Sequence, residues 1–289
     1  MAALSSLNPK AFLALASSSG RPDLVSVNNG DPAELVKNAI NALGGMEQFV
    51  SKGDQVIIKP NISWDRVPQQ AATTNPTVVA EVVKLCFEAG AKNVVIFDNT
   101  LNEPRRCYKR SGIQKAAEDA GADVQYIYDR KFKTIRFPEG ELIKSWEVYD
   151  EVLKADKLIN IPAAKHHTVS GVSLGMKNLM GLIGGNRGRF HRNYDIKITD
   201  LNARIRPVLT VLDAYRVLLR NGPSGGNIAD VELRKTLIAG TDPVAVDAMG
   251  ASFFNLDPHN LNFLKLAQER GLGKIDISPG KMKKISLTS

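Results

Sequence analysis

Short apolar segments alternate with helix-like segments through the first half of this 289-residue chain. Four segments have the composition of β-strands: residues 23–29, 55–61, 93–99 and 123–129. Three helices are expected between them, at residues 32–43, 76–90 and 105–120. Asn75 before Pro76 is typical of a helix start, with an N-cap followed by proline in the first turn. This alternation predicts parallel βαβ units, and therefore an α/β, Rossmann-like, mostly parallel sheet with helices on both faces.

The second half of the chain adds elements of another kind. Alternating apolar and polar residues between Lys131 and Trp146 predict a small antiparallel excursion. Further strands are expected at 157–162, 207–215 and 236–240, and further helices at 243–254 and 261–270. No linker interrupts this pattern, so residues 23–289 are expected to form a single α/β domain with a soft lobe boundary near residue 150. Residues 1–22 are expected to form a flexible N-terminal arm.

Composition narrows the class of function. The net charge of +8 favours anionic partners. No nucleic-acid-binding module accompanies the basic residues, so nucleic acid is not an expected partner. No apolar run reaches the roughly 18 residues of a membrane span. The N-terminus is a poor signal peptide, which favours a cytoplasmic location and leaves open periplasmic export of a longer precursor. The oligomeric state is also open, with a homodimer among the alternatives.

The two cysteines restrict the cofactors that this chain can hold. An iron–sulfur cluster typically needs four thiolates, so Cys86 and Cys107 cannot bind one alone. Cys86 lies in an apolar helical pattern and is expected in the core. Cys107 is flanked by cationic residues and is interpreted as a thiol on a helix surface, the alternative being a reactive thiol with a lowered pKa.

Polar residues follow several of the predicted strands. Ligands of open parallel sheets bind at the carboxyl ends of the strands, so these residues are expected to converge on one cleft. They are Lys59, Asn61, Asp98, Asn99, Lys165 to His167, Asp213 and Asp242. Each could instead be a simple turn or cap residue. Thr74 lies before a helix N-terminus, where an anion site and simple capping are equally good interpretations.

The run from Lys165 to Arg192 combines histidine and lysine with many glycines. Lys177 lies between apolar neighbours, where a lysine is costly unless it has a partner or a function. Because His166 and His167 are adjacent, they point to opposite faces of an extended chain, and only one is expected to enter the site. We interpret His167, Lys177 and His191 as catalytic, the alternative being a buried structural network.

Arginines next to the glycines suggest what the site binds. Arg187 and Arg189, together with backbone amides, are expected to hold a carboxylate or phosphate, because the guanidinium group is a planar fork of donors. The spacing matches neither a zincin helix nor a Cys/His zinc site, and no glycine run has the Walker A pattern.

Four phrases of this sequence resemble a known family. They are VIIKPNI (56–62), TTNPTVVAEVV (73–83), AKHHTVSGVSLGMKNLMG (164–181) and AGTDPVAVDA (239–248). In their order, from about Val25 to about Arg270, they resemble the domain of unknown function 362 family. Many members of that family carry a ferredoxin-like cysteine segment, which this sequence lacks, so the iron–sulfur label of the family is not transferred.

A more distant resemblance concerns the site itself. The order of a strand, a histidine, a lysine, a glycine run and a second histidine is similar to lactate racemase-like proteins. By that resemblance, Lys177 would anchor a nickel-pincer-like cofactor, and His167 and His191 would bind a transition metal or carry protons and hydride. The chemistry implied is of isomerase or oxidoreductase type. At residues 97–100 the chain reads Phe-Asp-Asn-Thr where those racemases have Gly-Thr-His. The first catalytic base is therefore either missing or Asp98, which argues against lactate racemisation.

The sequence therefore favours an enzyme that acts on a small anionic substrate, with or without a metal or organometallic cofactor. The alternative is a non-catalytic protein that binds an anion or a metal, or assists a redox partner. The expected catalytic residues are His167, Lys177, His191 and Asp98. The expected substrate-binding residues are Lys59, Asn61, Thr74, Asn178, Arg187, Arg189, Asp213 and Asp242.

Overall fold

The structure is a computed structural model that describes residues 20–288. Residues 1–19, most of the predicted N-terminal arm, lie outside the described residues. The strands are β1 (Leu24–Asn28), β2 (Gln55–Pro60), β3 (Asn93–Ile96), β4 (Asp123–Val124), β5 (Phe132–Arg136), β6 (Ser145–Tyr149), β7 (Lys157–Ile161), β8 (Ala163–His167), β9 (Gly171–Ser173), β10 (Leu209–Leu218), β11 (Val231–Gly240) and β12 (Met282–Ser286). The α-helices are α1 (Pro32–Ala42), α2 (Pro76–Glu88), α3 (Pro104–Arg110), α4 (Ile113–Asp119), α5 (Asp150–Lys154), α6 (Gly175–Asn178), α7 (Arg187–Phe190), α8 (Tyr194–Arg204), α9 (Pro243–Ala251) and α10 (Asn262–Glu269).

Most strands of the described chain belong to one twisted sheet. The strand order is β12-β1-β11-β10-β7-β2-β3-β4, with β8 and β9 attached through β10. From β10 to β4 every neighbouring pair is parallel, whereas β11 is antiparallel to both β1 and β10. β5 and β6 pair with each other in a separate antiparallel ribbon, at the place of the predicted excursion. The predicted α/β class with a mostly parallel sheet is confirmed.

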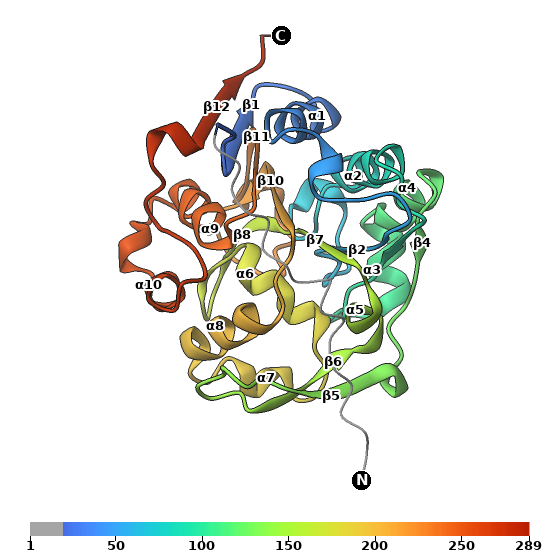
Figure 1. The fold of residues 1–289 in the computed structure, drawn as a ribbon, viewed down its shortest axis with the longest axis vertical. Helices are drawn as coiled ribbons and strands as arrows, with labels where there is room; N and C mark the ends of the chain where they lie inside the picture. Colours follow the sequence, from blue (N-terminus) through green and yellow to red (C-terminus); the bar gives the residue numbers. More distant parts are fainter. Residues whose placement is uncertain (1–19, 289) are drawn as a thin grey trace.

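The two faces of the sheet bury different apolar layers. Successive side chains of a strand point to opposite faces, so Val56 and Ile58 of β2 pack with α1, α2 and α4, whereas Ile57 faces the other layer. That second layer contains the apolar side chains of α8, α9 and α10. Figure 1 shows the sheet between these two groups of helices. Because helices cover both faces of the sheet, side chains that point to either face are buried. This explains why the strands are apolar throughout.

Some predicted elements differ in extent. The single helix expected at 105–120 is two helices, α3 and α4, because Gly112 between them has φ of 74°. The strand expected at 123–129 is only two residues long, since its neighbour β3 ends at Ile96, whose carbonyl accepts the last bond, from Gln125.

Cys107 is not the surface thiol that the sequence suggests. It lies on the inner side of α3, fully buried, and burial raises its pKa to about 11. The cationic neighbours in the sequence point away from it, and two of them, Arg106 and Arg110, pair with Asp65. Cys86 is buried in α2, as expected.

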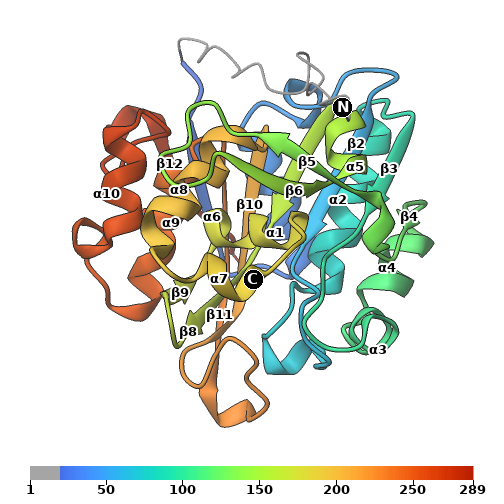
Figure 2. The ribbon, with the colours of Figure 1, turned by 90° about the horizontal axis from the view of Figure 1, so that it is seen from below.

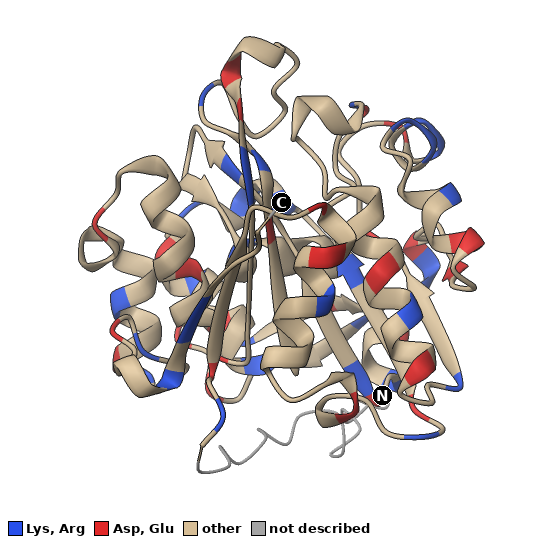
Figure 3. Cartoon of the chain, turned by 90° about the horizontal axis from the view of Figure 1, so that it is seen from above, with Lys and Arg blue, Asp and Glu red and all other residues tan. Residues whose placement is uncertain are grey.

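The direction of the strands decides which ends can form a site. The carboxyl ends of β2, β3, β7 and β10 share one edge of the sheet, where β10 and β11 continue as a hairpin that projects beyond it (Figure 2). Lys and Arg are spread over the described elements and mixed with Asp and Glu (Figure 3). Within residues 20–288, no helix is long and apolar enough to cross a membrane.

Candidate active site

A cavity of about 170 Å³ lies at the edge of the sheet where the parallel strands end. Its walls come from the segment after β2, from β8 and β9, from α6 and α7, and from the tip of the β10–β11 hairpin. The lining residues are Asn61, Ser63, Trp64, Leu101, Lys165, His167, Ser173, Lys177, Asn178, Met180, Gly181, Arg187, Gly188, His191 and Pro223. Among these described residues, three are cationic, two are histidine and none is Asp or Glu.

Lys177 is a buried lysine whose side-chain amine contacts an imidazole, a thioether and an aromatic ring. Its Nζ lies 3.1 Å from His191 Nε2 and 3.4 Å from Met180 Sδ, and it sits 5.0 Å from the centre of the Tyr194 ring. The ring face offers the amine some stabilisation when it is charged. Burial nevertheless lowers the pKa of Lys177 to about 7. A large fraction of Lys177 is therefore a neutral amine near physiological pH.

His167 is held in one tautomer by the turn between β8 and β9. Its Nδ1 accepts hydrogen bonds from the backbone N–H groups of Val169 and Ser170, at 3.1 and 3.2 Å. The proton of the neutral ring must then be on Nε2. Burial, and next the charge of Lys177, lower the pKa of His167 to about 3. His167 is thus a neutral hydrogen-bond donor and not a base.

His191 has the complementary arrangement. Its ring stacks on that of His167 with centroids 5.6 Å apart, and its Nε2 faces the Lys177 amine. With the ring proton on Nδ1, Nε2 accepts from Lys177. Burial lowers the pKa of His191, and hydrogen bonding of its ring to the backbone carbonyls of Arg187 and Gly188 partly offsets this effect. His191 is placed to exchange protons with Lys177.

Lys165 and Arg187 supply the other cationic groups. Lys165 Nζ donates to Asn61 Oδ1 at 3.0 Å and to the carbonyl oxygen of Ala72 at 2.5 Å, and burial lowers its pKa to about 7. Arg187 donates to the carbonyl oxygens of Asn99 and Thr100 at 2.6 and 3.0 Å. Lysine has three donors and arginine five, so both residues keep N–H groups beyond these bonds.

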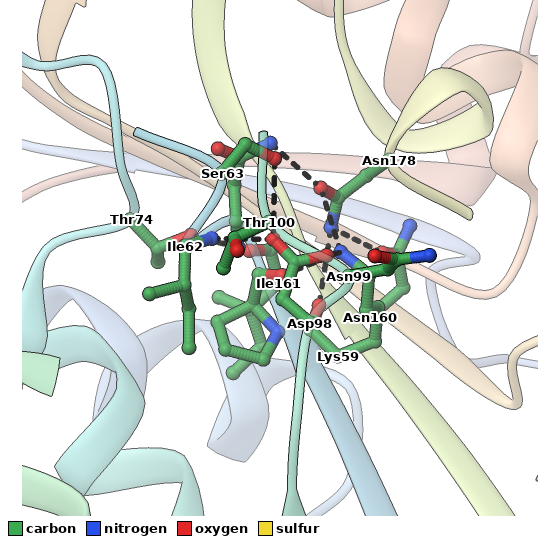
Figure 4. A network of polar contacts seen from close by, with 12 residues as sticks. Lys59, Ile62, Ser63, Thr74, Asp98, Asn99, Thr100, Asn160, Ile161 and Asn178 are labelled. Atoms are coloured by element: carbon green, nitrogen blue, oxygen red, sulfur yellow. Dashed lines mark hydrogen bonds and ion pairs between the residues drawn. The ribbon is translucent and has the colours of Figure 1, made fainter. Parts of the chain in front are cut away.

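A polar network beneath the cavity fixes its floor (Figure 4). Lys59 Nζ lies 2.9 Å from Asp98 Oδ1 and donates to the carbonyl oxygen of Pro60 and to Asn178 Oδ1. Asn178 also donates to the Lys59 carbonyl and to Asn160 Oδ1, and accepts from Asn61. The second oxygen of Asp98 accepts from Ile62 N–H at 2.6 Å. This network therefore supplies hydrogen-bond or ion-pair partners for most polar atoms of Lys59, Asp98 and Asn178.

The backbone of Gly181 lies between this network and the cavity. A Cβ at this position would clash with Asp98 Oδ1 and with the Lys59 side chain. The backbone of Gly181 therefore lies directly on the ion pair, and its carbonyl accepts from Asn99 N–H at 3.0 Å. Asp98 does not line the cavity, so its expected role as a base is not supported by its position.

A second buried carboxylate positions α6, which carries Lys177. Asp247 of α9 accepts from the N–H groups of Gly175 and Met176 at 2.6 and 2.9 Å. Burial raises the pKa of Asp247 to about 7. Asp247 has no role in the prediction from sequence, although it lies in the phrase AGTDPVAVDA.

Four of the expected site residues lie away from the cavity. Asp242 follows β11, and because β11 is antiparallel its carboxyl end is at the opposite edge of the sheet, where Asp242 caps α9. Asp213 accepts from Asn75 N–H at 2.7 Å, so a carboxylate already occupies the start of α2. Thr74 donates to the Ile161 carbonyl and accepts from Asn61 N–H, so its hydroxyl joins the ends of β2 and β7, whereas Asn75 caps α2. Arg189 is exposed.

The other expected residues converge as the strand-end argument predicts. Asn61, His167, Lys177, Asn178, Arg187 and His191 line the cavity, and Lys59 lies beneath it. His166 points the other way, and its Nδ1 accepts from Gly222 N–H at 3.2 Å. Lys165, expected at the cleft as a strand-end residue but given no binding role, also lines the cavity, because it alternates with His166 on β8 and so shares a face with His167.

The described lining residues supply few ligands for a metal ion. Among residues 20–288, no group of three or more His, Cys, Asp or Glu is placed to hold a metal ion. His167 offers no free lone pair in its fixed tautomer, which leaves His191 as the only imidazole acceptor among the described lining residues.

Known proteins resemble this chain at several levels. A thylakoid-associated protein of Synechocystis sp. is 26% identical over 255 residues, which cover 86% of this chain and 77% of that protein. A crystal structure from Thermotoga maritima has a TM-score of 0.44 and 13% identity, and covers 83% of this chain and 60% of that one. The lactate racemase apoprotein of Thermoanaerobacterium thermosaccharolyticum has a TM-score of 0.47 and 14% identity to this chain. The aligned part covers 82% of this chain and 58% of the racemase chain. This chain thus spans less than two thirds of either solved structure.

The family comparison covers most of the chain. The sequence profile of the domain of unknown function 362 matches residues 56–252, which include the parallel strands, the cavity and the helix that carries Asp247. The chain belongs to the domain of unknown function 362 family.

Proposed function

We propose that this protein is an enzyme that acts on a small anionic substrate, a carboxylate or phosphate compound, by acid–base chemistry in the cavity. One observation carries the proposal: Lys165, Lys177 and Arg187 line the cavity together with two histidines, and none of its described lining residues is acidic. Buried cationic groups without an acid are costly, and an anion in the cavity would remove that cost.

Binding would use the donors that the protein leaves unused. Lys165 and Arg187 are both oriented by backbone carbonyls, and both keep N–H groups for a ligand oxygen. Because Lys165 has a pKa of about 7, an anion next to it would favour its charged form. Affinity for a fixed anion should therefore fall as the pH rises above about 7.

The size of the cavity limits the substrate. A cavity of roughly 150 Å³ holds a molecule as large as benzene. At about 170 Å³ this one suits a substrate of similar size. Trp64, Leu101, Met180 and Pro223 give it an apolar part, which would hold a short carbon chain while the cationic groups hold the charged end.

The catalytic roles follow from the protonation states. Lys177 and His191 would remove or deliver a proton, since both are neutral over part of the pH range near 7 and lie 3.1 Å apart. His167 would donate from Nε2–H to an oxygen on which negative charge develops. This role differs from the metal-ligand or base role suggested by the sequence pattern.

Turnover by purified protein tests the proposal. We would incubate the full chain with short hydroxy acids, oxo acids and phosphorylated acids, and follow products and solvent-deuterium exchange by NMR. Lys177→Met and His191→Ala should each lower the rate about 10²- to 10⁴-fold, the usual contribution of an acid–base group. Lys265→Met, at an exposed position of α10, is the matched control and should keep the full rate.

The same experiment separates the enzyme from a binding protein. Stoichiometric binding of an acid without product at any pH would favour the non-catalytic alternative. Product formation that survives both Lys177→Met and His191→Ala would contradict the assigned roles.

A further inference from the structure

We propose that Lys177 forms an imine with the carbonyl carbon of a short 2-oxo acid, so that the substrate is processed as a covalent adduct. This inference rests on the proposed function, because it assumes that the cavity binds a small anion. It goes further in naming the carbonyl group as the point of attack and Lys177 as the nucleophile.

Three lysines lie in or beneath the cavity, and their contacts distinguish them. Lys59 uses its three N–H groups on Asp98, Pro60 and Asn178, and Gly181 covers it. Lys165 is tied to an amide oxygen and a backbone carbonyl, both of which favour an ammonium group. Lys177 contacts a thioether sulfur and an imidazole nitrogen, and both are weak partners for a charge. It is therefore the lysine with an available lone pair.

The groups around Lys177 suit the steps of imine formation. The Nζ lone pair attacks the carbonyl carbon, the C–N bond forms, and the π electrons move to oxygen, which receives the hydrogen bond from His167 Nε2. His191 Nε2, at 3.1 Å, takes a proton from the attacking nitrogen. A proton from solvent converts the alkoxide into a hydroxyl group. His191 then returns its proton to this hydroxyl group, which leaves as water while the nitrogen lone pair forms the C=N bond of an iminium ion.

The remaining groups explain why an oxo acid is expected. Lys165 and Arg187 line the same cavity and keep free donors for the carboxylate. The developing iminium is cationic, so it needs the negative charge of the substrate in a cavity whose described lining residues include no acid. A neutral aldehyde or ketone would leave that charge uncompensated. The substrate should therefore carry its carboxylate close to the carbonyl group.

Reduction of the imine tests the proposal. The full chain would be incubated with pyruvate or glyoxylate and sodium borohydride, and adducts would be located by intact mass and peptide mapping. We expect one adduct per chain at Lys177, formed at least about tenfold faster than at exposed lysines, because the cavity holds the carbonyl in place. Lys265→Met should label like the parent, whereas Lys177→Met should not label in the cavity.

Oxamate separates this inference from the proposed function, since it has the shape of pyruvate but its amide carbonyl does not form imines. Oxamate should raise the melting temperature of both the parent and Lys177→Met, and should protect Lys177 from labelling. If oxamate binds but pyruvate labels only surface lysines, the imine is wrong and the anion site stands. If neither oxamate nor any other small acid binds, both proposals fail.

Discussion

Lys59 and Lys177 are two lysines buried close to one another with opposite surroundings. Lys59 has an ion-pair partner at 2.9 Å and an acceptor for each N–H, and the backbone of Gly181 lies over it. Lys177 lines the cavity, and its closest polar neighbours are an imidazole and a thioether. Burial lowers the pKa of both amines, but the Asp98 carboxylate offsets this effect only at Lys59.

This difference in surroundings indicates a structural role for Lys59 and a chemical role for Lys177. A paired and covered ammonium group has no N–H donor left for a ligand. Lys59 therefore has a structural role, in which it fixes the ends of β2 and β3 relative to Asn178. An unpaired amine is a cost to the fold that a ligand can relieve. We therefore expect substitutions at Lys59 to act on stability and substitutions at Lys177 to act on function.

Removal of Lys59 should have the largest effect on stability. Lys59→Met leaves the Asp98 carboxylate buried with only the Ile62 N–H and the Ser63 hydroxyl as donors. Loss of one partner of a buried pair costs about 3–5 kcal/mol. Urea unfolding should show this loss, with Lys265→Met as the control. Adding Asp98→Asn to Lys59→Met should recover part of it, and a double variant less stable than Lys59→Met would contradict the ion-pair interpretation.

A methyl group at Gly181 should have the next largest effect. Gly181→Ala forces Cβ against Asp98 and Lys59, and overpacking of this kind costs about 1–3 kcal/mol. Gly280→Ala is the matched control, because no atom lies within 4 Å of its added Cβ and it also lacks a positive φ. Equal unfolding free energies for the two variants would show that the ion pair is not tightly covered.

Loss of the Asp247 carboxylate should act on Lys177 indirectly. Asp247→Ala leaves the N–H groups of Gly175 and Met176 without their acceptor, and loss of such a cap costs about 0.5–2 kcal/mol. Because α6 carries Lys177, labelling of Lys177 by pyruvate and borohydride should also slow. Restored labelling in Asp247→Asn, whose amide oxygen can still accept, would distinguish positioning from a general loss of folding.

The sequence predicts the fold better than it predicts the individual roles. Strand ends that carry Lys59, Asn61 and His167 meet because parallel strands end at one edge, and that rule needs only the alternation of strands and helices. Asp242 obeys the same rule locally, but the reversed direction of β11 takes it to the other edge. Strand direction depends on long-range pairing, which one sequence does not reveal.

The role of His167 also depends on structure beyond its own residue. Its tautomer is set by two backbone N–H groups in the turn after β8, so spacing to Lys177 and His191 could not show that it is a donor. The sequence places Lys165 among the strand-end residues but assigns it no role, although residues two apart on a strand share a face and Lys165 therefore accompanies His167. The sequence could not show which of Arg187 and Arg189 reaches the cavity, because both are arginines beside the same glycines. Only the placement of α7 brings Arg187 to the cavity.

Lys177→Met should have the smallest effect on stability and so tests the comparison most sharply. At pH 7 the substitution removes a buried amine whose hydrogen-bond partners are a thioether and an imidazole, and such replacements are commonly neutral or stabilising, here by about 1 kcal/mol. Thermal and urea unfolding would measure it beside Lys59→Met. A loss as large as that of Lys59→Met would mean that Lys177 supports the fold through a partner, and that the two lysines do not differ in kind.

The pH dependence of the unfolding free energy shows whether the Lys177 amine stabilises or destabilises the folded chain. The pKa of Lys177 is about 7 in the folded chain, whereas the ordinary value for a lysine is 10.5, so between these values the unfolded chain binds more protons and stability rises with pH. From pH 7 to pH 9 the parent should gain about 1–2 kcal/mol from Lys177, a gain that Lys177→Met lacks. Any advantage of Lys177→Met at pH 7 should therefore shrink by pH 9. An advantage that grows over this range would show that the Lys177 amine is charged in the folded protein, and would place it with Lys59 as a structural lysine.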